Sequence, residues 1–136
     1  VGRAAQAAGS CMILADTSVW INHINSGPDE RLVAFLNGVR IVMHDFVIGE
    51  IAMGSLRNRS QQLAMLRDLP RAIHVSNGEA LLLVEGADLH GSGLSFIDAH
   101  LLAAAIASPA QGRVRIWTGD KCLHAHAARL GVAYMP

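Results

Sequence analysis

The sequence has few charged residues, few cysteines and no long apolar run, and each scarcity excludes a class of protein. Charged residues make up 16% of the chain against 51% hydrophobic residues, a balance that argues against intrinsic disorder. Two cysteines, Cys11 and Cys122, are too few for a disulfide framework in 136 residues, so we expect a reducing, cytoplasmic location. No apolar run approaches the ~18 residues that cross a bilayer, and we therefore expect no membrane span.

The first eleven residues differ from the rest of the chain. They contain a single basic residue, Arg3, and no apolar core, so they do not form a secretory signal peptide. Regular patterning begins at Met12. We expect residues 1–11 to be a disordered extension or a remnant of cloning, and residues 12–136 to form one domain that is long enough to bury a core.

Short apolar runs alternate with stretches of helical periodicity from Met12 onward. This alternation is typical of an α/β protein in which helices cover both faces of a parallel sheet. We predict a three-layer α/β/α fold with a short, mostly parallel central sheet flanked by helices. The expected strands span 12–15, 39–43, 72–75, 114–117 and 132–135. The expected helices span 17–24, 28–37, 45–56, 60–69, 77–90, 96–107 and 121–130.

Two aspartates follow predicted strands. Asp16 ends the first apolar run and precedes two hydroxyl residues, Thr17 and Ser18. Asp120 follows the strand at 114–117 and precedes a helix. Open parallel sheets place their ligand crevice at the carboxyl ends of strands, so both positions suit a functional site. Either aspartate could equally be the N-cap of the helix that follows it.

Two further acids lie inside apolar helical stretches. Glu50 is the only charge in residues 46–53, where burying an ionised carboxylate is costly without a partner or a metal. The alternative is that Glu50 lies on a narrow solvent-exposed stripe. Asp98 lies three residues after Ser95, and this Ser-x-x-Asp spacing fits a capping box that would make Asp98 purely structural.

The four acids are harder to explain together than one by one. The ends of two strands and parts of two helices can meet at one edge of a sheet. Carboxylates gathered there repel one another by roughly 4 kcal/mol for a pair ~4 Å apart in an effective dielectric of about 20. Only Lys121 adjoins any of them in the sequence. A hard divalent cation with oxygen ligands, Mg²⁺ or Mn²⁺, would neutralise such a cluster.

Four motifs that contain these acids, taken in order, closely resemble the PIN domain, and more narrowly the VapC toxins of bacterial VapBC toxin–antitoxin systems. The motifs are ILADTSVWI at 13–21, VIGEIAMG at 47–54, FIDAHLL at 96–102 and WTGDK at 117–121. The resemblance covers the chain from Met12 to its C-terminus. Cys122 departs from it, because family members often carry a charged or polar residue at that place.

The resemblance implies a metal-dependent ribonuclease in which the four acids bind one or two Mg²⁺ or Mn²⁺ ions. Thr17, Ser18 and Thr118 match hydroxyl positions that would orient ligands or water beside those acids. The implied reaction is hydrolysis of an RNA phosphodiester, which leaves a 5′ phosphate and a 3′ hydroxyl. The implied protein partners are a small VapB antitoxin and, in a homodimer, a second copy of the chain.

Several basic side chains are candidates for contacts with RNA phosphates: Arg57, Arg59, Arg113, Arg115 and Lys121. Each could equally be an ordinary solvated surface cation. If the four acids share one pocket, seven acids remain against eleven Lys and Arg, and a mildly basic surface of this kind suits an anionic partner. The few aromatic residues, 4% of the chain, show no stacking platform, so the sequence does not indicate which RNA is bound.

Two other function classes fit part of the pattern. A receiver-like phosphoacceptor domain also gathers carboxylates and Mg²⁺ at the ends of parallel strands, but here its acceptor could only be Asp45. The other class is a non-catalytic interaction module that keeps the PIN fold. The histidines receive no role, because they are scattered. His124 and His126, two residues apart on a helix, point away from each other, unlike metal-binding pairs four residues apart.

Overall fold

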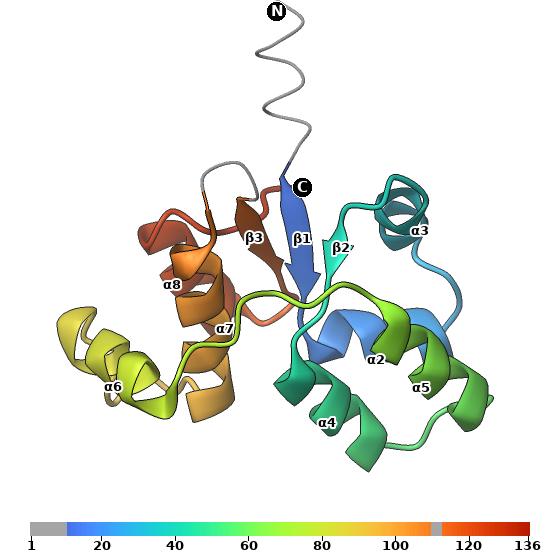
Figure 1. Ribbon diagram of the computed structural model, residues 1–136, viewed down its shortest axis with the longest axis horizontal. Helices are drawn as coiled ribbons and strands as arrows, with labels where there is room; N and C mark the ends of the chain where they lie inside the picture. Colours follow the sequence, from blue (N-terminus) through green and yellow to red (C-terminus); the bar gives the residue numbers. More distant parts are fainter. Residues whose placement is uncertain (1–10, 110–112) are drawn as a thin grey trace, which may run out of the picture.

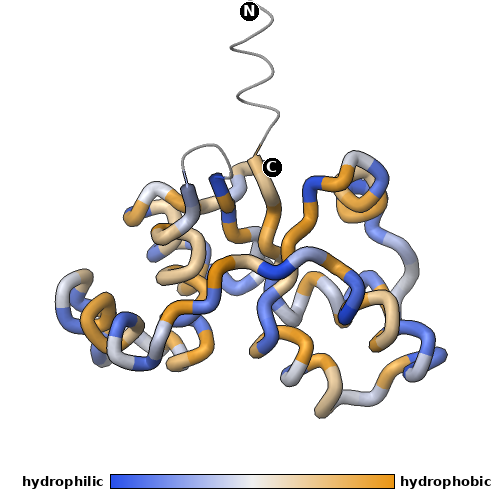
Figure 2. Tube along the Cα trace, in the orientation of Figure 1, coloured by the Kyte–Doolittle hydropathy of each residue, from blue (hydrophilic) through white to orange (hydrophobic). Residues whose placement is uncertain are grey.

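The computed structural model describes residues 11–109 and 113–136, so all but the last residue of the extension expected at 1–11 lies outside the described residues. At the centre is a parallel sheet of three strands in the order β2-β1-β3. The strands are β1 (Met12–Ala15), β2 (Ile41–Val42) and β3 (Val114–Trp117). Figure 1 shows them in the middle of the molecule, and Figure 2 shows hydrophobic residues along β1 and β2.

Seven helices surround this sheet within the described residues, and the expected α/β fold is confirmed. In Figure 1, α6 (Asn77–Gly86), α7 (Phe96–Ala107) and α8 (Lys121–Arg129) lie to one side of the strands. To the other side lie α3 (Glu30–Asn37), α4 (Asp45–Met53) and α5 (Arg59–Asp68), while α2 (Thr17–Asn25) follows β1. None of the helices in the described parts of the chain combines the length and apolar character needed to span a bilayer.

The register of the sheet places the ends of β1 and β3 side by side. Ala15 pairs with Trp117, and the amide of Asp16 donates to the Trp117 carbonyl at 2.9 Å. Strand β1 lies between its two neighbours, and Ile13, Leu14 and Ala15 are 1% exposed or less. A central parallel strand is buried on both faces, which explains its uninterrupted apolar run. Asp16 and the loop after β3 are therefore delivered to the same edge of the sheet.

The outer strands are shorter than predicted. β2 has only two residues, and the strands expected at 72–75 and 132–135 are reduced to single parallel bridges, Met43–Arg71 and Ile116–Ala133. Ile73 is 42% exposed, so the chain leaves the sheet after Ala72 and turns toward α6. Apolar composition marks these segments as core-facing. At 72–75 the turn toward α6 limits how long the chain stays in the sheet.

Two helices end earlier than predicted. α4 stops at Met53 because Gly54 is extended, with ψ 176°, and because the Arg59 guanidinium donates to the carbonyls of Ala52 and Gly54. α6 stops at Gly86, and Asp88 then adopts a left-handed φ of 53° that ends the helical path. In both cases the apolar periodicity continues past the point where the backbone leaves the helix.

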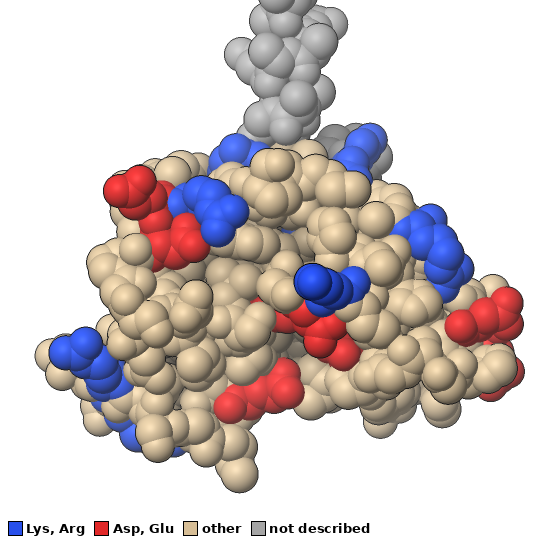
Figure 3. All heavy atoms as spheres, turned by 180° about the vertical axis from the view of Figure 1, so that it is seen from behind, with Lys and Arg blue, Asp and Glu red and all other residues tan. Residues whose placement is uncertain are grey.

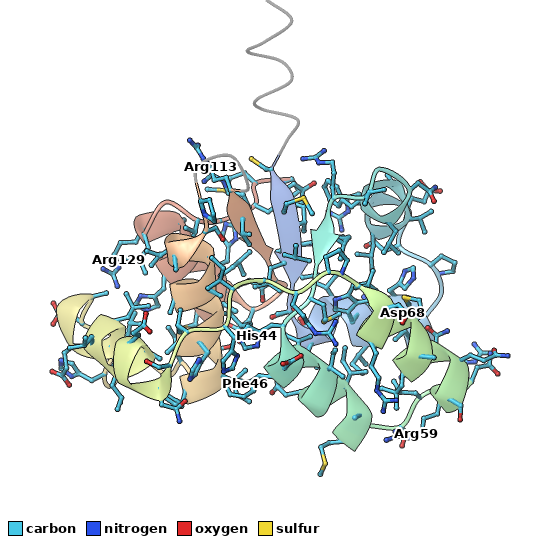
Figure 4. All side chains as sticks on the ribbon, viewed as in Figure 1. His44, Phe46, Arg59, Asp68, Arg113 and Arg129 are labelled. Carbon is cyan, nitrogen blue, oxygen red and sulfur yellow. The ribbon has the colours of Figure 1, made fainter. Side chains whose placement is uncertain are left out.

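Three histidines from different segments form an aromatic cluster that the sequence pattern does not reveal. His44 precedes α4, His74 precedes α6, and His100 lies in α7. The ring centroids of His44 and His74 are 5.2 Å apart, and those of His74 and His100 are 5.6 Å apart. Phe46 and Phe96 each pack against His100 at 4.8 Å. Figure 4 shows His44 and Phe46 between α4 and α7, so the cluster joins these two helices.

His44 is held in its neutral form. It is the N-cap of α4, and its Nδ1 accepts a hydrogen bond from the Phe46 amide at 3.0 Å, so the ring proton is on Nε2. This Nε2 is buried and has no partner among the described residues. Burial lowers the pKa of His44 to about 4, with repulsion from His74 and His100 adding to the effect and Asp45 opposing it. A second proton on Nδ1 would also break the helix cap.

Acidification should destabilise the fold through His44. Because its pKa is about 4 in the folded protein against 6.5 ordinarily, the folded state binds fewer protons between these values, and stability falls as the pH drops through that range. We expect the free energy of unfolding, measured by urea titration, to fall by about 2 kcal/mol between pH 7.5 and pH 5. His44→Asn keeps a capping oxygen but cannot be protonated, so it should lose most of this dependence. An undiminished dependence in that variant would contradict the assignment.

Candidate active site

Asp16 is fixed at the corner between β1 and α2. It is 9% exposed and is the N-cap of α2, where its Oδ1 accepts hydrogen bonds from the Val19 amide at 3.3 Å and from the Ser18 hydroxyl at 2.6 Å. Its Oδ2 accepts a hydrogen bond from the Thr118 hydroxyl. The capping interpretation is therefore correct, but it does not exclude a functional one, because the cap sets the direction of the carboxylate.

Thr118 connects Asp16 to the second strand-end aspartate. Its Oγ1 donates to Asp16 and accepts a hydrogen bond from the Asp120 amide at 3.0 Å. Asp120 is in turn the N-cap of α8, with Oδ1 accepting from the Leu123 amide at 3.0 Å. One hydroxyl thus links the acid that ends β1 to the acid that follows β3.

Asp98 lies in the first turn of α7 and forms the capping box predicted from its spacing to Ser95. The Ser95 amide donates to Asp98 Oδ2 at 3.1 Å, and the Asp98 amide donates to Ser95 Oγ at 3.0 Å. The pKa of Asp98 is nevertheless raised, mainly by burial and further by the negative charges of Asp120 and Asp16, while the bonds to Ser95 lower it. Asp98 therefore acts as a structural cap within the electrostatic field of the other two acids.

Glu50 comes to the same place from α4. Its Oε1 accepts a hydrogen bond from the Thr17 hydroxyl at 2.8 Å, which joins α4 to the first turn of α2. The side chain is exposed, as the solvent-stripe alternative required. The exposed side chain of Glu50 faces a cleft and not a convex surface, because Glu50 and Thr17 are both lining residues of this cleft.

This acidic cleft has a volume of about 850 Å³ and contains all four predicted acids. Figure 3 shows acidic side chains gathered near the centre of one face, beside a hollow and bordered by basic side chains. The cleft is lined by Asp16, Thr17, Ser18, Val19, Ile21, Asn22, Asp29, Arg31, Glu50, Asp98, Leu101, Trp117, Gly119 and Asp120. The fold therefore brings together acids that are far apart in the sequence, from Asp16 near the start of the domain to Asp120 near its end.

The donor atoms of the acidic cleft suit a hard cation. Among the described residues, no group of three or more His, Cys, Asp or Glu side chains is arranged to hold a metal ion directly. The available side-chain ligands in the lining are carboxylate oxygens, hydroxyl oxygens and the amide oxygen of Asn22, and hard cations such as Mg²⁺ and Mn²⁺ prefer oxygen ligands. Mg²⁺ keeps several of its waters and commonly uses one or two carboxylates, so these residues fit a hydrated cation better than a fully dehydrated one.

The predicted phosphate-binding cations lie outside this lining. The Arg59 guanidinium binds carbonyls at the end of α4, and Arg115 donates to the Gly131 carbonyl at 2.6 Å. Figure 4 shows Arg113 at the amino-terminal end of β3, away from the acid-bearing edge. Arg57 and Lys121 are exposed, and Lys121 begins α8 directly after Asp120.

Arg31 is the basic residue of the cleft lining, and the sequence interpretation missed it. The Pro28-Asp29 pair does indicate a helix start, so a capping role for Asp29 is visible in the sequence. Nothing local indicates that this helix start lies beside β3.

Three residues of α8 that stood out in the sequence are Cys122, His124 and His126. Cys122 donates through Sγ to the Ser92 carbonyl at 3.2 Å, so at this position the chain uses the thiol to join α8 to the loop before α7. His126 Nδ1 lies 3.0 Å from the Arg129 guanidinium, and His124 and His126 are both half-buried. Neither histidine lines the acidic cleft.

Comparison with known proteins identifies the fold family. The model of the PIN domain matches residues 13–129. The chain belongs to the PIN domain family. Its relatives include Ribonuclease VapC32 of Mycobacterium tuberculosis, from strains CDC 1551 / Oshkosh and ATCC 25618 / H37Rv, each 42% identical over 122 residues that cover 90% of this chain and 95% of the relative. This PIN domain is therefore a homologue of the VapC ribonucleases, and the resemblance read from its four motifs is confirmed.

Membership of the PIN family excludes the receiver-like alternative. Asp45, the acceptor which that alternative required, is exposed at the start of α4, and its Oδ1 lies 2.7 Å from Nε of Arg71. It does not line the acidic cleft. A non-catalytic PIN module shares the fold of a ribonuclease, so metal binding and RNA cleavage are the properties that separate the two.

The electrostatic coupling of the acids can be tested without metal or RNA. Asp120→Asn removes a negative charge near Asp98 but keeps a good capping residue for α8, so the pKa of Asp98 should fall toward its ordinary value. A carbon-detected NMR titration of side-chain carboxyls in EDTA measures this change. Asp68→Asn, at the end of α5 and outside the cleft, is the matched control and should leave Asp98 unchanged. The coupling is absent if the pKa of Asp98 is the same in both variants.

Proposed function

We propose that this PIN domain is a Mg²⁺- or Mn²⁺-dependent ribonuclease in which Asp16, Glu50, Asp98 and Asp120 bind one or two cations. The observation that carries the proposal is the convergence of four acids from four different segments in one cleft, where burial, and to a smaller extent the charges of Asp120 and Asp16, raise the pKa of Asp98. The M. tuberculosis relatives are ribonucleases by name, which supports the same reaction. The two free cysteines support the expectation that the chain acts in a reducing cytoplasm.

The proposed reaction is hydrolysis of an RNA phosphodiester that leaves a 5′ phosphate and a 3′ hydroxyl. A bound divalent cation supplies Lewis-acid activation of water and neutralises the charge that develops on the phosphate. The protein positions the carboxylates that would hold the cation. Ser18 and Thr118 fix the two oxygens of Asp16, and Thr17 orients Glu50. No separate general base is assigned, because these carboxylates hold cations and do not need to accept the proton of the attacking water.

Loss of one acid should abolish cleavage while the fold is retained. Asp16→Asn and Asp98→Asn keep capping oxygens for α2 and α7, so both variants should fold. We expect each to cleave RNA at least about 100-fold more slowly than the wild type in Mg²⁺, because a lost ligand should cost at least as much as a lost supporting group. The assay is cleavage of total RNA with mapping of cut sites, in Mg²⁺ and then in EDTA.

The matched control for this assay is Asp68→Asn, which removes an exposed acid outside the cleft and should cleave at the wild-type rate. Full activity of Asp98→Asn would remove Asp98 from the catalytic set. Full activity of the wild type in EDTA would overturn the metal dependence. A wild type that binds Mn²⁺ but cleaves no RNA would favour the non-catalytic module.

We further propose a VapB antitoxin and a second copy of the chain as protein partners. A largely apolar cleft of about 510 Å³ lies beside the acidic one, lined in part by Phe46, Met53, Phe96 and Ile97, and Glu50 lines both clefts. An antitoxin segment seated there could bring a basic side chain to the acids and replace cation charge.

Calorimetry and sedimentation test these two partners. A titration of Mn²⁺ into the free chain and into its complex with a VapB antitoxin should show weaker Mn²⁺ binding in the complex, by roughly tenfold or more, because the antitoxin's basic group competes for the same acids. Unchanged Mn²⁺ affinity and undiminished cleavage in the complex would contradict the proposed inhibition. Sedimentation of the free chain establishes whether it is a dimer.

A further inference from the structure

Arg31 is the only Lys or Arg among the described residues that line the acidic cleft. It is the second residue of α3, and its side chain is 53% exposed. Every other ionisable group in the lining is a carboxylate. A polyanionic substrate that enters this cleft therefore meets one basic side chain in the lining itself, that of Arg31.

The backbone around Arg31 is ordered by Asp29, the N-cap of α3. Asp29 Oδ1 accepts hydrogen bonds from the amides of Arg31 at 2.9 Å and Leu32 at 3.3 Å. The same carboxylate pairs with the guanidinium, with Nη2 of Arg31 3.2 Å from Oδ2 and Nε 3.4 Å from Oδ1. The guanidinium lowers the pKa of Asp29, so the pair stays charged.

A second contact fixes the plane of the Arg31 side chain. Its Cζ lies 4.9 Å from the ring centroid of Trp117, the last residue of β3, which is itself only 6% exposed. A guanidinium held over a buried indole gains a cation–π contact and loses rotational freedom. Asp29 and Trp117 together pre-organise Arg31 beside the strand end that leads to Asp120.

This arrangement suits phosphate binding better than it suits stabilisation. Ion pairs with exposed partners contribute little to stability, and here both side chains are partly solvated. A guanidinium that is already oriented loses less entropy when it binds a phosphate, and the edge formed by Nη1 and the outer hydrogen of Nη2 can offer the phosphate two N–H donors. Nε and Nη2 face Asp29, while no hydrogen bond to a described residue occupies Nη1.

We propose that Arg31 is a positioning residue for RNA, whose guanidinium binds a backbone phosphate next to the one that is cleaved. The inference rests on the proposed ribonuclease function and names the protein group that holds the substrate strand at the α3 side of the cleft. The cations held by the acids neutralise the reacting phosphate. The neighbouring phosphate is bound by the N–H donors of Arg31 that the pair with Asp29 does not use among the described residues.

The test compares Arg31→Gln with Arg67→Gln, an exposed arginine of α5 outside the cleft. With a labelled single-stranded RNA in Mg²⁺, Arg31→Gln should raise KM about tenfold and leave kcat within about twofold, whereas Arg67→Gln should match the wild type. The slope of log(kcat/KM) against log[KCl] should become shallower by about 0.7, the value for one lost phosphate contact on a single strand. Arg31→Lys should restore the slope but not the full KM, because lysine lacks the fork.

A binding measurement separates this inference from the ribonuclease proposal. Fluorescence anisotropy with the same RNA in EDTA reports binding without cleavage, and Arg31→Gln should bind several-fold more weakly than Arg67→Gln. If the wild type cleaves RNA but the two variants have equal KM, salt slope and anisotropy, the role of Arg31 is overturned and the ribonuclease stands. If the wild type cleaves nothing but the anisotropy difference persists, the ribonuclease fails and the phosphate contact stands.

Two other outcomes would also overturn the inference. A fall in kcat with unchanged KM would place Arg31 in the chemical step and not in strand positioning. Weaker binding of an antitoxin to Arg31→Gln, with RNA binding unaffected, would make Arg31 a protein contact. Circular dichroism melting of both variants controls for folding, and Asp29 remains in each to cap α3.

Discussion

The repulsion among carboxylates at one edge of the sheet is the constraint on which the rest of this structure depends. Ala15 and Trp117 are partners in the parallel register of β1 and β3. Asp16 and the Thr118–Asp120 loop, which follow these two residues, therefore lie at the same edge of the sheet. The fold then offsets the repulsion locally. Asp16 and Asp120 cap α2 and α8, and Asp98 lies in the first turn of α7, so three helix amino termini converge on the negative charges. Carboxylates at such termini are stabilised by the helix dipole and by free amides.

Because of this convergence, the same acids can be helix caps and functional groups at once. A helix cap uses one oxygen or one edge of a carboxylate and fixes the direction of that carboxylate. A carboxylate that binds a metal must be oriented in the same way. Glu50 is the exception, because it lies in the second half of α4, away from the positive end of that helix. The Thr17 hydroxyl compensates, and it comes from the residue that begins α2. Glu50 is consequently the acid with the least backbone support and the one nearest the apolar cleft.

The sequence predicts those features that depend on local pattern and strand order. The ends of β1 and β3, the limits of α7, and the meeting of Asp16 with Asp120 follow from apolar runs, capping residues and the rule that parallel strands end at one edge. The addition of Glu50 and Asp98 to these two acids is what the resemblance to the PIN domain implies. Features that depend on tertiary packing are not predicted. His44, His74 and His100 share no periodicity, and their contact requires the loop before α6 to pass beside both α4 and α7. Arg31 meets Trp117 only because α3 packs near the end of β3.

Buried His44 and half-buried Asp98 give the fold opposite responses to pH, and a bound cation would change their balance. The pKa of His44 is lowered to about 4, so this residue removes stability as the pH falls from 6.5. The pKa of Asp98 is raised from 3.8, so the metal-free fold loses stability as the pH rises above that value and Asp98 ionises. A cation that binds ionised Asp98 reverses the second effect, because the carboxylate is then favoured in the folded state. With a cation bound, acidification lowers the free energy of unfolding of the domain through both His44 and Asp98. The metal-loaded domain must then be more acid-sensitive than the metal-free domain.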